Sequence, residues 1–145
     1  MHHVLYNNQI LRLAASTASA ARLTAPQGSA LKVSQLCGSK VTADVDLDQG
    51  GRICRFGLEI RACALGQAAA ALVSAHVIGC DSAALEAARD ELAGWLVARR
   101  EAEPSWPGFG VFAPARPHRA RHPSILLTFD AAIAAIAAAR GTPAD

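Results

Sequence analysis

The sequence lacks the features that mark membrane and secreted proteins. No apolar run approaches the roughly 18 residues that a membrane span needs. The opening segment, MHHVLYNNQILRLAASTASA, has no basic start and no unbroken apolar stretch of about 7 to 15 residues, which argues against a secretory signal. We therefore expect no membrane association and a cytoplasmic location, where thiols stay reduced.

Aromatic residues and excess charge are also scarce. Phe, Trp and Tyr make up 5% of the chain, and the formal net charge is +2. Binding of nucleic acid requires a broad basic face or aromatic side chains on which bases stack, so we expect no nucleic-acid partner. No Cys–His–Asn/Asp set typical of a cysteine hydrolase stands out, and the chain is not expected to be an enzyme.

What the chain does have is the composition of one globular domain. It contains 145 residues, of which 52% are hydrophobic and 18% are charged. This length supports one substantial core but not two, and no internal repeat divides it. We therefore expect residues 1–145 to form a single domain.

Two segments in the first half alternate apolar and polar residues. Residues 41–47 read VTADVDL, residues 53–60 read ICRFGLEI, and the turn-forming sequence DQGG joins them. Alternation with period two predicts a pair of antiparallel strands with one solvated face, and it places Cys54 on the inner face. Residues 30–35 are a candidate for a third strand.

Helical periodicity surrounds this hairpin. Residues 4–21 are helix-like, and further helices are predicted over 66–78, over 83–100 with Ser82 as N-cap, and over 123–140. Residues 101–122 form a long loop rich in Pro and Arg, which is uncommon in a small domain and often functional. Strands followed by helices predict an α+β fold, with a small antiparallel three-stranded sheet and helices packed on one face.

Two of the four cysteines stand at the ends of the predicted hairpin. Cys37 precedes its first strand and Cys63 follows its second, so antiparallel pairing brings them to the same end of the sheet. Two thiolates placed in this way could bind one metal ion or one two-iron cluster, since soft sulfur ligands favour iron–sulfur clusters and zinc. The alternative is a pair of unrelated buried cysteines. Cys54 and Cys80 are both interpreted as core residues.

A cluster of arginines precedes the last helix. The stretch ARPHRARH, residues 115–122, contains Arg116, Arg119 and Arg121. One interpretation is a solvated basic loop. The other is a positive rim that stabilises thiolates or an anionic cluster and docks an acidic partner.

Four segments resemble the NifU/IscU family of iron–sulfur cluster assembly scaffolds, most closely its SufU branch. LYNNQI (5–10) is similar to the opening helix of that family, and CGSKVTADVDLDQGGRICRFGLEIRACALGQAAA (37–70) is similar to its hairpin. RHPSILLTFDAAIAAI (121–136) resembles its final helix, and the long loop before it resembles an insertion typical of the SufU branch. The family's NPRN-like motif is replaced by ASTASAARL (15–23).

The resemblance implies a ligand set that is altered in this chain. The family surrounds a cluster or a zinc ion with three cysteines and an aspartate. Cys37 and Cys63 match the first two cysteines, whereas Ser39 occupies the aspartate position and Pro123 the third cysteine position. His122 matches a histidine that precedes the third cysteine in many family members. Cys37, Cys63 and His122 are therefore the implied cofactor and metal ligands.

The function implied is that of an iron–sulfur cluster assembly scaffold. Cys37 and Cys63 would transiently bind iron and sulfide, or a two-iron two-sulfur cluster, and pass it to an acceptor protein. A cysteine desulfurase would supply the sulfur. Two alternatives stay open: a family member without cluster binding that acts as an interaction partner of a cysteine desulfurase, and a zinc-dependent sulfur relay protein that uses Cys37.

Overall fold

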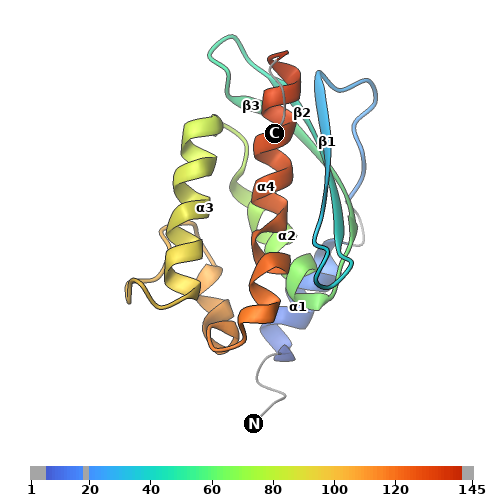
Figure 1. Ribbon diagram of the computed structural model, residues 1–145. Helices are drawn as coiled ribbons and strands as arrows, with labels where there is room; N and C mark the ends of the chain where they lie inside the picture. Colours follow the sequence, from blue (N-terminus) through green and yellow to red (C-terminus); the bar gives the residue numbers. More distant parts are fainter. Residues whose placement is uncertain (1–5, 18–19, 142–145) are drawn as a thin grey trace.

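The computed structural model describes residues 6–17 and 20–141 (Figure 1). The elements run in the order α1 (Asn8–Ser16), β1 (Gly28–Val33), β2 (Lys40–Leu47), β3 (Ile53–Arg61), α2 (Ala64–His76), α3 (Ser82–Leu96), the 3₁₀ helices η3 (Phe109–Ala115) and η4 (Arg119–Arg121), and α4 (His122–Ala139). The three strands form one antiparallel sheet in the order β1-β2-β3, which confirms the predicted α+β fold.

The helices lie on one face of this sheet. Figure 1 shows α4 in front of the sheet, between α3 and β1, and α4 packs against β1, β2, α2 and α3. The approach of β1 to α4 is close, because a Cβ added at Gly28 would overlap the carbonyl oxygen of Ala135 and lie 2.5 Å from the backbone nitrogen of Ala139. A side chain at this position would therefore push the edge strand away from the central helix.

A β-bulge changes the predicted orientation of Cys54. Asp46 pairs with Arg55, but the next residue, Leu47, pairs with Ile53. Cys54 is therefore the extra residue of the bulge, and it is exposed, whereas Ile53 is buried in the core. The prediction of a core position for Cys54 was wrong because a bulge shifts the two-residue alternation by one position.

The helix boundaries differ from the predicted ones by a few residues. The N-cap of α3 is Asp81 and not Ser82, since the carboxylate of Asp81 accepts a hydrogen bond from the backbone N–H of Ala84 at 2.9 Å. The same helix ends at Leu96, because Ala98 takes a left-handed conformation with φ 63°. Within the described residues, α1 covers only the middle of the predicted 4–21 helix.

The segment between α3 and α4, predicted as a long loop over 101–122, is packed and contains the 3₁₀ helices η3 and η4. Phe109 and Phe112, in η3, are buried, and the ring of Phe109 lies 5.7 Å from that of Phe129 in α4. The indole N–H of Trp106 donates to the carbonyl oxygen of Leu72 at 2.8 Å. These contacts attach the segment to the helical layer. Turns of 3₁₀ helix have no apolar period of their own, so the sequence pattern did not indicate them.

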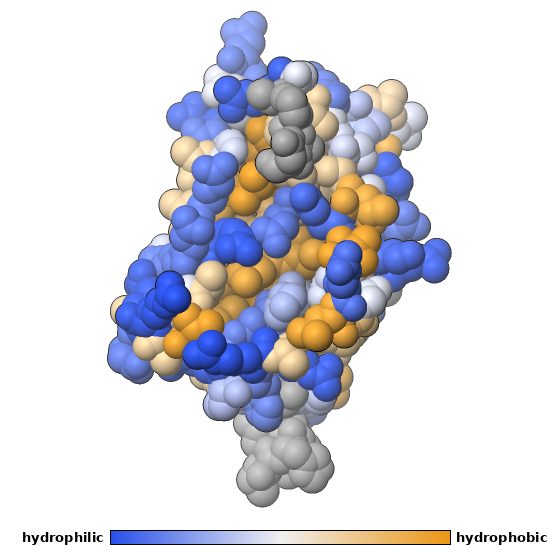
Figure 2. Space-filling model, in the orientation of Figure 1, coloured by the Kyte–Doolittle hydropathy of each residue, from blue (hydrophilic) through white to orange (hydrophobic). Residues whose placement is uncertain are grey.

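The central helix is apolar enough to raise the question of a membrane span. Residues 119–139 are long and apolar enough to cross a membrane. However, 61% of their most apolar 18-residue stretch is buried inside the domain. On the face shown in Figure 2, apolar surface near α4 is bordered by hydrophilic side chains. Burial against the sheet and the neighbouring helices accounts for this composition, as in the core helix of a globular domain.

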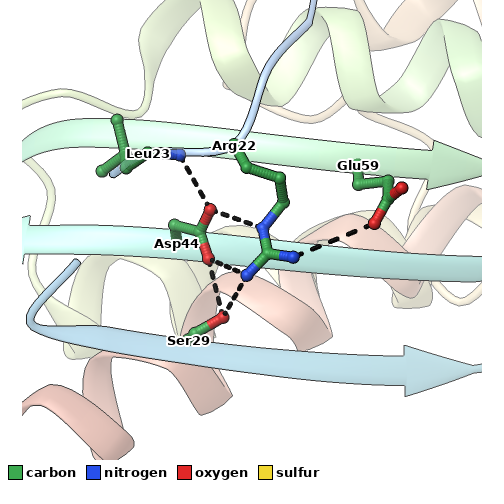
Figure 3. Close-up of polar contacts among 5 residues, drawn as sticks. All are labelled: Arg22, Leu23, Ser29, Asp44 and Glu59. Atoms are coloured by element: carbon green, nitrogen blue, oxygen red, sulfur yellow. Dashed lines mark hydrogen bonds and ion pairs between the residues drawn. The ribbon is translucent and has the colours of Figure 1, made fainter. Parts of the chain in front are cut away.

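An ion pair between Arg22 and Asp44 lies on the outer face of the sheet, opposite the helices (Figure 3). The carboxylate of Asp44, on β2, is fully buried, and it accepts hydrogen bonds from the guanidinium of Arg22, the hydroxyl of Ser29 and the backbone N–H of Leu23. Burial opposes the charged carboxylate, but these donors outweigh it and lower the pKa of Asp44. The pair thereby fixes the segment before β1 across the sheet.

Candidate functional site

Three segments meet at the end of the sheet that lies away from the hairpin turn at residues 48–51. Lys40, the first residue of β2, pairs with Arg61, the last residue of β3. Cys37 therefore lies three residues before this pair, and Cys63 two residues after it. The third segment is the first turn of α4, because a Cβ added at Gly66 of α2 would lie 3.7 Å from the Cβ of Ser124.

Cys37 lies in the short loop that joins β1 to β2. The backbone N–H of Ser34 donates to the carbonyl of Ser39 at 2.8 Å, and the N–H of Gly38 donates to the carbonyl of Ser34 at 2.7 Å. Gly38 has φ 75°, a conformation that residues with a side chain rarely adopt. The glycine after Cys37 therefore permits the tight loop that holds the thiol at the sheet end.

Three serine hydroxyls surround the sulfur of Cys37. The Sγ atom lies 2.8 Å from Oγ of Ser124, 3.1 Å from Oγ of Ser39 and 3.3 Å from Oγ of Ser34. All three serines are buried, with exposed fractions of 2%, 3% and 5%. Residue Cys37 is itself exposed. The result is an accessible thiol whose sulfur rests on hydroxyl groups supplied by its own loop and by α4.

This environment favours the thiolate form of Cys37. Burial of the sulfur raises its pKa, but hydrogen bonds with Ser124, Ser34 and Ser39 outweigh that effect and lower the pKa to about 6. As a thiol, Cys37 donates its one proton to the hydroxyl of Ser34, whereas a thiolate can accept from the hydroxyls of Ser39 and Ser124. The N-termini of α2 and α4 also lie at this end, where the helix dipoles favour negative charge.

Cys63 is the N-cap residue of α2, which begins two residues earlier than predicted. Its side chain makes no capping hydrogen bond, and the residue is partly buried against the core. Both predicted cysteine ligands thus lie at the same end of the sheet. Cys80, which the sequence assigned to the core, is partly buried against it, and burial together with the charge of Asp81 raises the pKa of its thiol.

The imidazole of His122 points into the packed segment before α4. It is 6% exposed, and its Nε2 atom lies 3.1 Å from the carbonyl oxygens of both Ala115 and Arg116. Since carbonyl oxygens accept hydrogen bonds, this contact requires the proton on Nε2. Pro123 occupies the first turn of α4, as predicted, and contributes no ligand atom.

The donor set at the sheet end does not make a complete site for a cluster or a metal ion. Within residues 6–17 and 20–141, no group of three or more His, Cys, Asp and Glu side chains could hold a metal. Ser39, which the family resemblance places at the aspartate position, has a neutral hydroxyl that contacts Cys37. Serine is a poor metal ligand at neutral pH because its hydroxyl stays protonated.

Sequence reasoning missed two of the residues that contact the Cys37 sulfur. Ser34 and Ser124 were not predicted as residues of the site. Ser39 was named, because the family resemblance places it at the position of an aspartate. Ser34 carries a local signal, because a serine three residues before a cysteine can fold back onto it in a tight loop. Ser124 carries none, since it is 87 positions from Cys37 and reaches it only through the packing of α4 on the sheet.

Comparison with solved structures finds close matches over nearly the whole chain. The structure of the N-terminal part of a nitrogen-fixing NifU-like protein from Brucella abortus superposes with a TM-score of 0.86, at 35% identity over 97% of each chain. An iron–sulfur cluster assembly scaffold protein for the SUF system, from Fervidobacterium islandicum AW-1, matches with a TM-score of 0.77 at 18% identity, covering 94% of this chain and 99% of that one.

A third structure, of a hypothetical protein, matches with a TM-score of 0.67 at 16% identity, covering 90% of this chain and 98% of that one. At such low identities the second and third matches show the fold alone. No protein-family model matches the sequence, and no curated protein matches it. The Brucella protein is similar enough, over enough of both chains, to show the family. This chain belongs to the NifU-like family.

Proposed function

We propose that this NifU-like protein takes part in iron–sulfur cluster assembly as a sulfur acceptor, with Cys37 as the accepting thiolate. The observation that carries the proposal is the set of three serine hydroxyls within 3.3 Å of the Cys37 sulfur. A thiolate and not a thiol is the nucleophile in sulfur exchange, and these hydroxyls stabilise it without a metal ion. Membership of a family of assembly scaffolds supports the assignment.

The sulfur would come from the persulfide of a cysteine desulfurase. The Cys37 thiolate attacks the terminal sulfur of the donor's Cys–S–SH group. The sulfur–sulfur bond of the donor breaks, and a new one forms between the Cys37 sulfur and the transferred atom, which keeps its proton. The donor cysteine leaves as a thiolate, so charge balances and no external oxidant is needed. An iron–sulfur acceptor protein would then receive the sulfur.

Cluster binding is a second candidate, and the common position of Cys37 and Cys63 at the sheet end favours it. Here a two-iron two-sulfur cluster, or zinc, would be cargo held by Cys37 and Cys63, with His122 as a predicted third ligand. That role requires His122 to give up its contacts with two carbonyl oxygens. The residues present fit this candidate less well, because hydroxyls and not further ligands surround Cys37.

A third candidate is a family member without sulfur chemistry that acts only as an interaction partner. All three candidates describe a non-catalytic protein, and all agree with the predicted cytoplasmic location. They differ in what the protein retains: sulfane sulfur on Cys37, a metal ion with sulfide, or neither.

Transfer of radioactive sulfur separates them. A desulfurase supplied with labelled cysteine should label the wild-type chain, and the label should survive denaturation without reductant but not with it. Cys37→Ser should abolish labelling, whereas Cys54→Ser, at an exposed cysteine outside the site, should not. Equal labelling of the Cys37→Ser chain, or no labelling of the wild type, would reject Cys37 as the acceptor. Iron and sulfide retained through anaerobic purification would favour the cluster-binding candidate.

A further inference from the structure

The outer face of the sheet ends in an exposed row of residues next to the Cys37 loop. Val33, Lys40 and Arg61 are cross-strand partners on β1, β2 and β3. They share the outer face, because the buried residues Val41, Ala43 and Val45 of β2 alternate with Lys40. All three are exposed, so the last row of the sheet presents one aliphatic and two cationic side chains to solvent.

An exposed aliphatic residue immediately precedes Cys37 in the chain. The side chain of Leu36 is 67% exposed, which is the largest exposed fraction among the large apolar residues that the structure describes. Val33, at the start of the same loop, is 45% exposed. We call Val33, Leu36, Lys40 and Arg61, together with Arg121 in the turn before α4, the Cys37 face.

The three segments that surround Cys37 carry charges of one sign. The segments 32–40, 61–67 and 118–126, which form it, contain Lys32, Lys40, Arg61, Arg119 and Arg121 but no Asp or Glu. Among the described residues the ion pairs involve other arginines, so none of these five is neutralised by a carboxylate. Asp48 and Asp81 lie at the opposite end, where they line one hollow. On β3, the exposed carboxylate of Glu59 lies one row further along the sheet and is 3.9 Å from the guanidinium of Arg22.

We propose that the Cys37 face is the docking surface for an acidic protein surface on the sulfur donor, with Leu36 inserted into an apolar pocket of that partner. The inference rests on the proposed sulfur-acceptor function and names the chemistry of its partner. A positive field around the thiolate would steer a negatively charged surface toward it and raise the association rate. A single aliphatic anchor at the centre, desolvated on contact, would slow dissociation.

The same face fits a nucleic acid less well. The segments that build it contain no Phe, Tyr or Trp, so bases would find no stacking platform. Exposed aliphatic side chains in the Cys37 loop are suited to burial in a protein interface and not to contact with phosphates. An acidic protein is therefore the partner to which the composition of the Cys37 face points.

Direct binding measurements test this proposal. The affinity of the protein for a cysteine desulfurase would be measured by calorimetry at about 0.05 M and about 0.5 M salt, a range over which screening of surface charges becomes strong. We expect the double variant Lys40→Glu/Arg61→Glu to bind at least about tenfold more weakly at low salt, and to lose most of the salt dependence of the wild type. Leu36→Ser should weaken binding about tenfold at both salt concentrations.

The control is a charge reversal of the same size elsewhere. Arg52 and Arg99 are exposed and form no ion pair with another described residue, so Arg52→Glu/Arg99→Glu changes the net charge equally. This variant should bind as the wild type does. Undiminished binding by the Lys40→Glu/Arg61→Glu variant, or equal weakening by the control, would overturn the proposal, as would absence of binding by the wild type. The proposal would also be overturned if a single-stranded oligonucleotide bound at the same face more tightly than the desulfurase does.

The outcome is separable from that of the proposed function. If the desulfurase binds through the Cys37 face but no sulfur reaches Cys37, the docking surface stands and the sulfur-acceptor assignment fails. If sulfur reaches Cys37 at the wild-type rate in Lys40→Glu/Arg61→Glu, the acceptor assignment stands and the docking surface fails.

Discussion

The sulfur of Cys37 lies 2.8 Å from the hydroxyl oxygen of Ser124, which belongs to a helix 87 positions further along the chain. This contact joins the loop between β1 and β2 to the first turn of α4. The contact also gives the Cys37 thiolate a hydroxyl donor. This donor follows Pro123, the residue that the family resemblance places at the position of a ligand cysteine. The chemistry of the site depends on this contact more than on any other.

Removing that hydroxyl should raise the pKa of Cys37. Its value in the wild type is about 6, against an ordinary 9.0. A hydrogen bond to a charged group contributes roughly 1.5–3 kcal/mol, weakened here by solvent, so we expect Ser124→Ala to raise the pKa by about one unit. The pH dependence of iodoacetamide labelling at Cys37, followed by peptide mapping, measures it. Ser82→Ala, at the first residue of α3 and outside the Cys37 site, is the control, and an unshifted profile in Ser124→Ala would contradict the role of the contact.

The same pKa predicts how stability changes with pH. Because the pKa of Cys37 is lower in the folded chain than in the unfolded chain, the thiolate stabilises the fold above the ordinary value of 9.0, and this contribution is lost as pH falls toward about 6. The free energy of unfolding of the wild type, relative to Cys37→Ala, should therefore increase between about pH 6 and pH 9. Urea denaturation across this range measures it, and a constant or decreasing difference would be inconsistent with a stabilised thiolate.

His122 should act through the fold and not through sulfur chemistry. Removing its imidazole leaves the carbonyl of Arg116 without this donor, whereas that of Ala115 keeps the backbone N–H of His118, so His122→Ala should lower the free energy of unfolding by about 1–3 kcal/mol. Labelling of Cys37 should be unchanged. His118→Ala, at an exposed histidine nearby, should change stability by less than about 0.5 kcal/mol. Loss of bound metal without loss of stability would instead support His122 as a ligand.

Two glycines should respond in opposite ways to the same substitution. An alanine at Gly28 would collide with the backbone of α4, so Gly28→Ala should destabilise the protein by about 1–3 kcal/mol. At Gly94, inside α3, the nearest atoms are 4.0 Å from an added Cβ, and Gly94→Ala should stabilise the protein by up to about 1 kcal/mol through helix propensity. Thermal denaturation of both variants checks this. A stable Gly28→Ala chain would mean that β1 and α4 are not packed as closely as described.

The sequence predicts the positions of Cys37 and Cys63 because antiparallel pairing relates the two ends of a hairpin whatever packs upon it. It does not predict the surroundings of Cys37, since Ser124 arrives through the packing of α4 on the sheet. Cys54 was misassigned because a bulge adds one residue to β3 without a clear mark in the sequence. His122 matches a family position, but the sequence does not predict its hydrogen bonds. They depend on the 3₁₀ turns before α4, which have no apolar period to reveal them.

The most direct measurement is the mass of the protein after exposure to a cysteine desulfurase and cysteine, with a metal chelator present throughout. The account predicts a gain equal to one sulfur atom, located by peptide mapping on Cys37 and absent from Cys37→Ser. A gain found on another cysteine, or one that requires added metal, would contradict the claim that serine hydroxyls alone prepare Cys37 to accept sulfur.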